Sequence, residues 1–360
     1  MTVSVFGGPR SVEDMMEAAR KVIGHRPSSH AVKENRSLEV LKKGQMLNVI
    51  GYRDGGFAVI ASDDKFAPVL GYSDTQFTAD GMPPAMQWWM DMAEHALQTA
   101  LDNGYEVTPT AELRDGKYPE SVDELLTTRW DQSMPFNKEL VRITGKSYPT
   151  GCMATAMAQI MKYHSYPSTG QGYKGYAIDG KNGNYDFENT TYRYDRMLDV
   201  YSGNNYTEEQ ADAVAKLMLH CGVAVDMTYG LSGSGSYSND ATLALSEYFK
   251  YDSRLYSRDI YTKAEWMDII FDEISNGRPI LYGGATAQNA GHAFVFDGYD
   301  AEGLVHVNWG WSGSGNGYFE VALLNSNTGS YSYGQDMILM HTADAPALPY
   351  VSQWGIMPSI

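Results

Sequence analysis

The sequence lacks the features that define several classes of protein. Only two of its 360 residues are cysteine, Cys152 and Cys221, which excludes a disulfide scaffold and a multi-cysteine zinc site. Lysine and arginine number 27 against 44 aspartates and glutamates, for a formal net charge of −17, so the clustered positive charge that binds nucleic-acid phosphates is missing. No stretch approaches the roughly 18 consecutive apolar residues of a membrane helix. We therefore expect neither a nucleic-acid partner nor a membrane span.

The remaining composition is that of a globular protein with two domains. Hydrophobic residues make up 43% of the chain and charged residues 20%, and the chain is longer than the roughly 250–300 residues that one core usually supports. The segment Met1–Pro9 lacks the basic and apolar regions of a signal peptide. If the protein is exported, we expect its signal to be absent from this sequence.

The N-terminal part predicts a small α+β unit. Capping residues, period-2 alternation and an apolar stripe at helical spacing indicate its elements. We expect a helix capped at Ser11 and ended by Gly24, a hairpin of Met46–Tyr52 and Phe57–Ser62, a strand at Phe66–Tyr72 and a helix from Pro83 and Pro84 to Gly104.

Residues Tyr105–Asp123 carry charges, Pro, Gly and Thr without periodicity, as an exposed and cleavable linker does. We place the domain boundary there, with residues 1–112 as the first domain and 113–360 as the second.

The second domain changes from helical to β patterns, the α+β arrangement in which a cleft forms between the two halves. The Gly- and Ser-rich Tyr229–Tyr237 predicts a flexible loop. Expected elements are helices at Cys152–Tyr163 and after the caps Thr207 and Thr262, then strands at Ile280–Tyr282, His292–Asp297, Leu304–Asn308 and Tyr318–Leu323.

Cys152 is the candidate nucleophile. It follows Pro149-Thr-Gly151 and opens a run of good helix formers, and the N–H groups of a helix N-terminus lower a thiol's pKa. The alternative is that Cys152 is a small core residue. His292 is the candidate base, since it begins a strand about 140 residues later, a separation typical of papain-like layouts. The alternative is a structural histidine at a strand edge.

Other residues could complete or compete with this site. Trp309 and Trp311 flank a glycine and either fill the core or wall the site beside His292. Gln132 could donate to an oxyanion together with the backbone N–H of Cys152; the alternative is a solvated surface glutamine. His164 is expected to interact with helix-end carbonyls. His220 is expected to point away from Cys221, because successive residues of a helix do not face each other, so these two are not expected to form a dyad. Cys221 completes an apolar stripe, which favours a core position over the one disulfide that counting allows. No metal or nucleotide motif is present, and we expect no cofactor.

Four motifs together resemble the streptopain family of bacterial cysteine proteases, which includes interpain-like enzymes. They are Trp130-Asp-Gln132, the Cys-helix segment Thr150–Pro167, Gly291-His-Ala-Phe-Val-Phe-Asp-Gly298 and His306-Val-Asn-Trp-Gly-Trp311. Residues Gly56–Asp64 and Pro68–Ser73 look like that family's prodomain. The resemblance covers most of the chain and implies a papain-like catalytic domain of a helical half and an antiparallel β half, preceded by an inhibitory α+β prodomain.

The resemblance also implies roles for individual residues. Cys152 and His292 would form the catalytic dyad, Gln132 would donate to the oxyanion, and Trp309 and Trp311 would line the histidine side of the cleft. Either Asn308 or Trp309 would orient the histidine. Ser232, Gly233 and Gly291 would meet the substrate backbone. Relatives are secreted, self-processing endopeptidases that favour an apolar residue at the second position before the cut.

We therefore expect a latent protease with protein and peptide substrates and its own prodomain as intramolecular inhibitor. A Cys–His layout also suits a transglutaminase-like acyltransferase or an amidase. A third possibility is a non-catalytic adhesin built on a protease fold.

Overall fold

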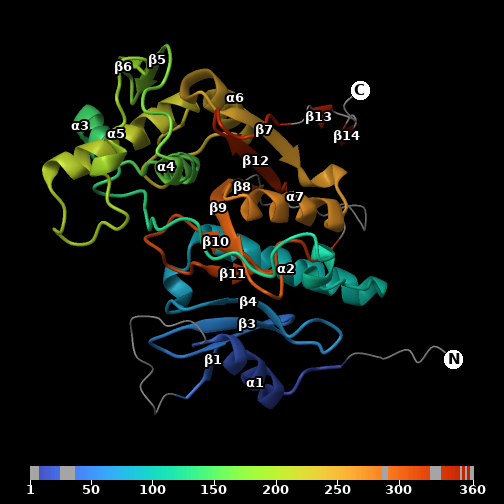
Figure 1. Cartoon of the computed structure of the whole chain (residues 1–360). Helices are drawn as coiled ribbons and strands as arrows, with labels where there is room; N and C mark the ends of the chain where they lie inside the picture. The colour runs from blue at the N-terminus through green and yellow to red at the C-terminus, as the bar shows by residue number, and fades with distance from the viewer. Residues whose placement is uncertain are drawn as a thin grey trace.

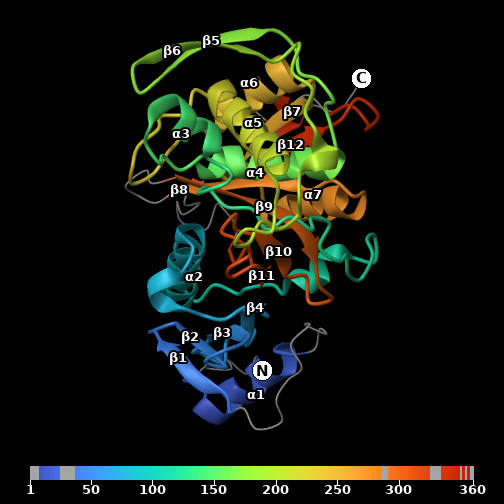
Figure 2. The same ribbon diagram turned by 90° about the vertical axis from the view of Figure 1, so that its left-hand side faces the viewer.

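The structure, a computed structural model, describes residues 8–24, 37–285, 291–324 and 334–348 and the backbone of 351–352 and 355–356. No described helix is long and apolar enough to cross a membrane. Figures 1 and 2 show the N-terminal strands at one end of the molecule and helices α3 to α6 at the other.

The N-terminal unit has the expected helices and hairpin, but the strand expected at Phe66–Tyr72 runs from Val69 to Ser73, and the strand Glu39–Lys43 was not expected. Ser11 caps the first helix, where its hydroxyl accepts a hydrogen bond from the N–H of Asp14 at 3.1 Å, and Gly104 ends the second long helix in a left-handed conformation. The expected hairpin is present, and every residue of its two strands is buried. The elements are α1 (Val12–Val22), β1 (Glu39–Lys43), β2 (Leu47–Gly51), β3 (Phe57–Ala61), β4 (Val69–Ser73), η1 (Ala79–Gly81), α2 (Pro84–Asn103) and η2 (Thr110–Arg114).

The second part contains the expected helices after Thr207 and Thr262, and both caps form reciprocal capping boxes. Its helices are α3 (Lys138–Thr144), α4 (Cys152–His164), η3 (Tyr194–Arg196), α5 (Glu208–Ala224), α6 (Ser238–Phe249), η4 (Arg258–Ile260) and α7 (Lys263–Ser275). Its strands are β5 (Tyr173–Ile178), β6 (Lys181–Asp186), β7 (Asp252–Ser257), β8 (Ile280–Ala285), β9 (Gly291–Tyr299), β10 (Val305–Asn308), β11 (Gly317–Phe319), β12 (Asp336–His341), β13 (Val351–Ser352) and β14 (Gly355–Ile356).

The expected strand at Tyr318–Leu323 is shorter than the sequence pattern indicates. β11 ends at Phe319. The carboxylate of Glu320 accepts a hydrogen bond from the N–H of Ala322 at 3.0 Å, so a local side-chain interaction turns the chain out of the ladder.

One sheet joins the two parts of the chain. Its ten strands in the described residues run β1-β2-β3-β4-β11-β10-β9-β8-β12-β7. The join lies between β4 and β11, where Tyr72 pairs with Tyr318 and Gly71 with Phe319, and the two tyrosine rings stack at 5.3 Å. The strands of the N-terminal unit thus extend the sheet of the second part, which nothing in the sequence indicated.

Helices cover both faces of this sheet. α2 and α7 bury one face, in a core that includes Trp89, Trp266 and Trp309. α4, α5 and α6 bury the other face, in a core that includes Met157 and Cys221. α2 packs against β8 and β9, as Figure 1 shows for β9, so a helix of the N-terminal unit packs on the central strands of the second part.

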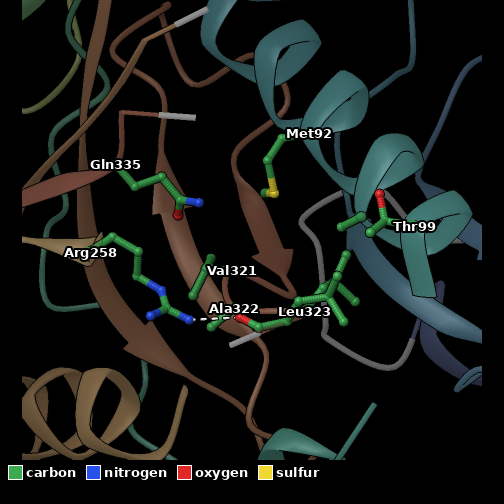
Figure 3. A pocket seen from close by; sticks show the side chains of 9 residues that line it. Met92, Thr99, Arg258, Val321, Ala322, Leu323 and Gln335 are labelled. Atoms are coloured by element: carbon green, nitrogen blue, oxygen red, sulfur yellow. Dashed lines mark hydrogen bonds between the residues drawn. The ribbon is translucent and has the colours of Figure 1, made fainter. Parts of the chain in front are cut away.

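The contact between α2 and the second part is tight. Figure 3 shows Met92 and Thr99 of α2 opposite Arg258 and Gln335, across a pocket of about 20 Å³. The buried Arg258 guanidinium donates to the carbonyl of Leu324 at 2.8 Å. Gln335 accepts a hydrogen bond from the hydroxyl of Tyr282 at 2.6 Å. Neither polar group is left without a partner under α2.

The expected linker lies against the second part of the chain. Val122 exchanges backbone hydrogen bonds of 2.9 Å with Tyr299 of β9, and Lys117 forms an ion pair of 2.9 Å with Asp268 of α7. Residues 115–117 and 119–121 are exposed nevertheless.

Candidate active site

The fold places Cys152 at the first position of α4. Gly151 precedes it with a φ of +90°, a conformation that glycine adopts readily. A Cβ at Gly151 would also overlap the side chain of Met227, so glycine is required there on two grounds. The Cys152 side chain is partly exposed, and it projects from the end of the helix where unpaired N–H groups gather.

Strand β9 approaches this thiol directly. The N–H of Ala293 donates to the Cys152 sulfur at 3.4 Å across 141 positions of sequence. Cys152 and His292 line one cavity of about 800 Å³. The structure therefore brings the candidate nucleophile and the strand of the candidate base together, which local sequence could not establish.

The direction of the His292 side chain follows from the sheet. Successive residues of a strand point to opposite faces. Phe294 packs on Trp88 of α2, with ring centroids 5.8 Å apart, so His292 projects toward the same α2 face. Its cross-strand partner is Gly284, where a Cβ would overlap the Trp88 ring. His292 thus leaves the strand on the face opposite α4, and no hydrogen bond joins these two described residues, Cys152 and His292.

Burial sets the charge state of both groups. It raises the pKa of the Cys152 thiol, and the backbone N–H groups of Ala293, Met153 and Cys152 itself only partly offset it. Burial also lowers the pKa of His292. Near pH 7 this conformation therefore holds a neutral thiol and a neutral imidazole. The helix N-terminus alone had suggested a lowered thiol pKa, but desolvation is the larger effect here.

The tryptophans and Asn308 lie behind the site. Trp309 is 1% exposed, its indole N–H donates to the carbonyl of Gly315 at 2.9 Å, and its ring packs on Phe294 at 4.9 Å. Trp311 is partly buried against the same core. The Asn308 amide donates to the carbonyl of Thr128 at 2.8 Å. In this conformation Asn308 ties β10 to the chain before α3.

The other site candidates divide into two groups. Gly233 and Gly291 line the same cavity as Cys152, whereas Ser232 and Gln132 are not among its described lining residues. The carbonyl of Gln132 accepts a hydrogen bond from the N–H of Thr150 at 3.0 Å. Gln132 therefore stays near the start of α4.

The competing cysteine and histidines lie in other environments. Both cysteines are free, but only Cys221 is buried, whereas Cys152 is partly exposed, so the expected core position of Cys221 is confirmed and the disulfide is not formed. His220 accepts or donates a 3.0 Å hydrogen bond with the Tyr192 hydroxyl, and burial lowers its pKa to about 3. The Nε2 atom of His164 is buried without a partner among the described residues, so the expected helix-end contact is not made through this atom.

Sequence reasoning missed several cavity residues. Leu255 and Asp336 line the wall opposite Cys152, on β7 and β12. Ser238 begins α6 beside them. Neither α6 nor these two strands were expected: α6 follows a Gly- and Ser-rich loop, β7 is short and mostly polar, and β12 is a short apolar run without alternation.

A thiol at a helix N-terminus, beside a strand that carries a histidine and inside an open cavity, defines a cysteine hydrolase site. Comparison with known proteins agrees with this class. A model of the peptidase C10 family matches residues 130–319, and a model of the Spi protease inhibitor matches residues 13–97.

Known relatives cover nearly the whole chain. Streptopain of Streptococcus pyogenes is 30% identical over 89% of this chain and 88% of its own length. The thiol protease/hemagglutinin PrtT of Porphyromonas gingivalis is 33% identical over 80% of this chain. The matched region is only 36% of the length of PrtT. The structure of a Prevotella intermedia prointerpain A fragment superposes with a TM-score of 0.76, at 42% identity, covering 84% of this chain and 98% of that one.

The active interpain A structure from the same organism matches with a TM-score of 0.56 at 45% identity, covering 62% of this chain and 96% of that one. The chain belongs to the peptidase C10 family and is a cysteine peptidase with an inhibitor-like N-terminal region. The expected fold class, a papain-like α+β domain preceded by a small α+β unit, is confirmed.

Proposed function

We propose that this chain is the latent zymogen of a secreted cysteine endopeptidase, with Cys152 as nucleophile and His292 as general base. The observation that carries the proposal is the hydrogen bond from the N–H of Ala293 to the Cys152 sulfur. It holds the thiol one residue from the histidine, although 140 positions separate Cys152 from His292 in the sequence.

The first part of the chain, residues 1–112, is proposed to act as an intramolecular inhibitor. Trp88 of α2 packs on Phe294 and fills the space over Gly284, the cross-strand partner of His292. These contacts favour a position of the β8 and β9 ends in which the imidazole faces α2. The raised pKa of Cys152 and the lowered pKa of His292 support the same conclusion, because a working dyad needs a thiolate and an imidazolium.

Activation then requires a cut and the departure of α2. Residues 115–121 offer the most accessible place for the cut, since they include exposed positions on both sides of Tyr118. Release of α2 would uncover the face to which His292 points. The histidine could then swing around the end of β9 to the thiol, as both groups already line one cavity.

In the activated enzyme the reaction is acyl transfer to water. His292 accepts the proton of Cys152, and the thiolate attacks the peptide carbonyl. The backbone N–H of Cys152 and the side-chain amide of Gln132 would stabilise the oxyanion. His292 protonates the leaving amine, and water then attacks the thioester and releases the second product. Trp309 and Trp311 would shield the imidazole from water.

The test is casein digestion by the full-length chain after it has processed itself, compared with Cys152→Ala and His292→Ala after the same incubation. We expect both variants to stay folded and to lose digestion entirely. A peptide digest in the presence of an added amine separates hydrolysis from transfer, since a transferase would join the amine where a protease leaves new termini. Casein digestion by Cys152→Ala would contradict the proposal. The proposal would also be contradicted if, in the processed enzyme, iodoacetamide alkylates Cys152 no faster than it alkylates a small-molecule thiol.

A further inference from the structure

The cavity beside Cys152 contains an acidic group that the proposed dyad does not use. Asp336 begins β12 and lines this cavity. Its Oδ1 atom is buried and has no hydrogen-bond partner among the described residues. A buried polar atom without a partner is costly, so this carboxyl is a feature that calls for a ligand.

The sheet sets the distance from Asp336 to the thiol. Asp336 pairs with Gly283, and Gly283 pairs with Ala293, whose N–H contacts the Cys152 sulfur. Directly paired residues share a face of the sheet, so Asp336 and Ala293 point the same way. With about 5 Å per antiparallel pair, the two Cα atoms lie about 10 Å apart.

Glycine opens the space between them. A Cβ at Gly283 would overlap the Oδ1 atom of Asp336, so no other residue would leave the carboxyl in place. Met153 and Leu255 supply apolar surface to the same cavity. An apolar wall that leads to one carboxylate fits a side chain with an aliphatic stem and a cationic end, which is the shape of lysine and arginine.

The charge around Asp336 favours the same kind of ligand. The described residues that line the cavity include no lysine and no arginine, so no cation of the protein competes for the carboxyl there. Burial raises the pKa of Asp336 to about 6, and the Ser238 hydroxyl lowers it in part. Near pH 7.5 the carboxyl is therefore mostly ionised.

We propose that Asp336 makes this peptidase select a basic side chain, lysine or arginine, at a substrate residue within two positions of the cut. An extended peptide advances about 3.3–3.6 Å per residue, so the carboxyl lies within reach of a long side chain on either of these residues. This inference rests on the proposed peptidase function. It departs from the apolar preference that the family resemblance implies.

The test uses the full-length chain after it has processed itself. Mass spectrometry of a digested peptide library first gives the residues on both sides of each cut, where we expect enrichment of lysine and arginine at one position. Three peptides that differ only at that position are then compared. One carries arginine, one carries citrulline, which is the neutral isostere of arginine, and one carries leucine. Asp336→Asn should lower kcat/KM for the arginine peptide by about 10- to 100-fold. The citrulline and leucine peptides should change less than about threefold.

The matched control is Asp240→Asn, which removes an acidic group in the first turn of α6 that is not among the described lining residues. It should leave the arginine-to-citrulline ratio unchanged. The inference is overturned if Asp336→Asn and wild type have the same ratio of kcat/KM for the arginine peptide to kcat/KM for the citrulline peptide. It is also overturned if the library shows no enrichment of lysine or arginine near the cut. In either case, cleavage of the leucine peptide would leave the proposed peptidase function intact. If no peptide is cleaved and Cys152 is not alkylated, the proposed function fails and this inference fails with it.

Discussion

Replacement of Trp88 by alanine tests how the N-terminal unit holds the site inactive. Trp88 is 3% exposed, and loss of a buried tryptophan side chain typically costs about 3–5 kcal/mol. If that energy holds α2 over the ends of β8 and β9, its loss should raise the population of the open form by on the order of 100-fold or more, at 1.4 kcal/mol per factor of ten. Cys152 should become reactive in proportion.

The assay is alkylation of the intact chain by iodoacetamide, followed by mass spectrometry and peptide mapping. Cys221 serves as an internal reference, because it is 0% exposed and reacts only when the core opens. We expect Trp88→Ala to accelerate alkylation of Cys152 far more than that of Cys221. An equal acceleration of both would mean global unfolding.

Trp89→Ala is the matched control. Trp89 is 1% exposed, packs on Phe319 at 4.8 Å and donates to the carbonyl of Glu320 at 2.8 Å. Its loss should also destabilise the chain by about 3–5 kcal/mol, through the contacts with Phe319 and Glu320 and without removing the Trp88 ring from above Gly284. If the two variants expose Cys152 equally once corrected for stability, the role assigned to Trp88 is wrong.

Three further predictions concern stability, each measured by denaturant unfolding in a Cys152→Ala background. Gly284→Ala should weaken the docking of α2, because the new Cβ would overlap Trp88; unchanged stability of the intact chain would contradict this. Burial raises the folded-state pKa of Asp336 to about 6, so this group should contribute a loss of stability of up to about 3 kcal/mol as pH rises from about 4 to 6; the difference between the pH profiles of Asp336→Asn and its parent isolates this contribution, and identical profiles would refute it. Thr262→Ala should cost about 1 kcal/mol through loss of the α7 cap, and a change below about 0.3 kcal/mol would show that the capping box contributes little.

Local signals in the sequence predicted local structure well. The caps Ser11, Thr207 and Thr262 begin helices as expected, and the hairpin around Asp54-Gly-Gly56 is present. These features depend on hydrogen bonds between residues a few positions apart, which sequence displays directly.

Features that depend on distant parts of the chain were not predictable. The pairing of β4 with β11 joins Tyr72 to Tyr318, and no local pattern specifies such a partner. The charge state of Cys152 was expected from its helix end alone, whereas its pKa depends on how deeply β9 and the cavity walls bury it. Asp336 could not be assigned to the site, because only the sheet register brings it opposite Gly283.

The most direct test of the account is the intact mass of the chain during storage at neutral pH. The account predicts that wild type converts from 39.9 kDa to a shorter species whose new N-terminus lies between Tyr105 and Trp130, while Cys152→Ala and His292→Ala remain uncut. The same shortened product from purified Cys152→Ala would contradict it.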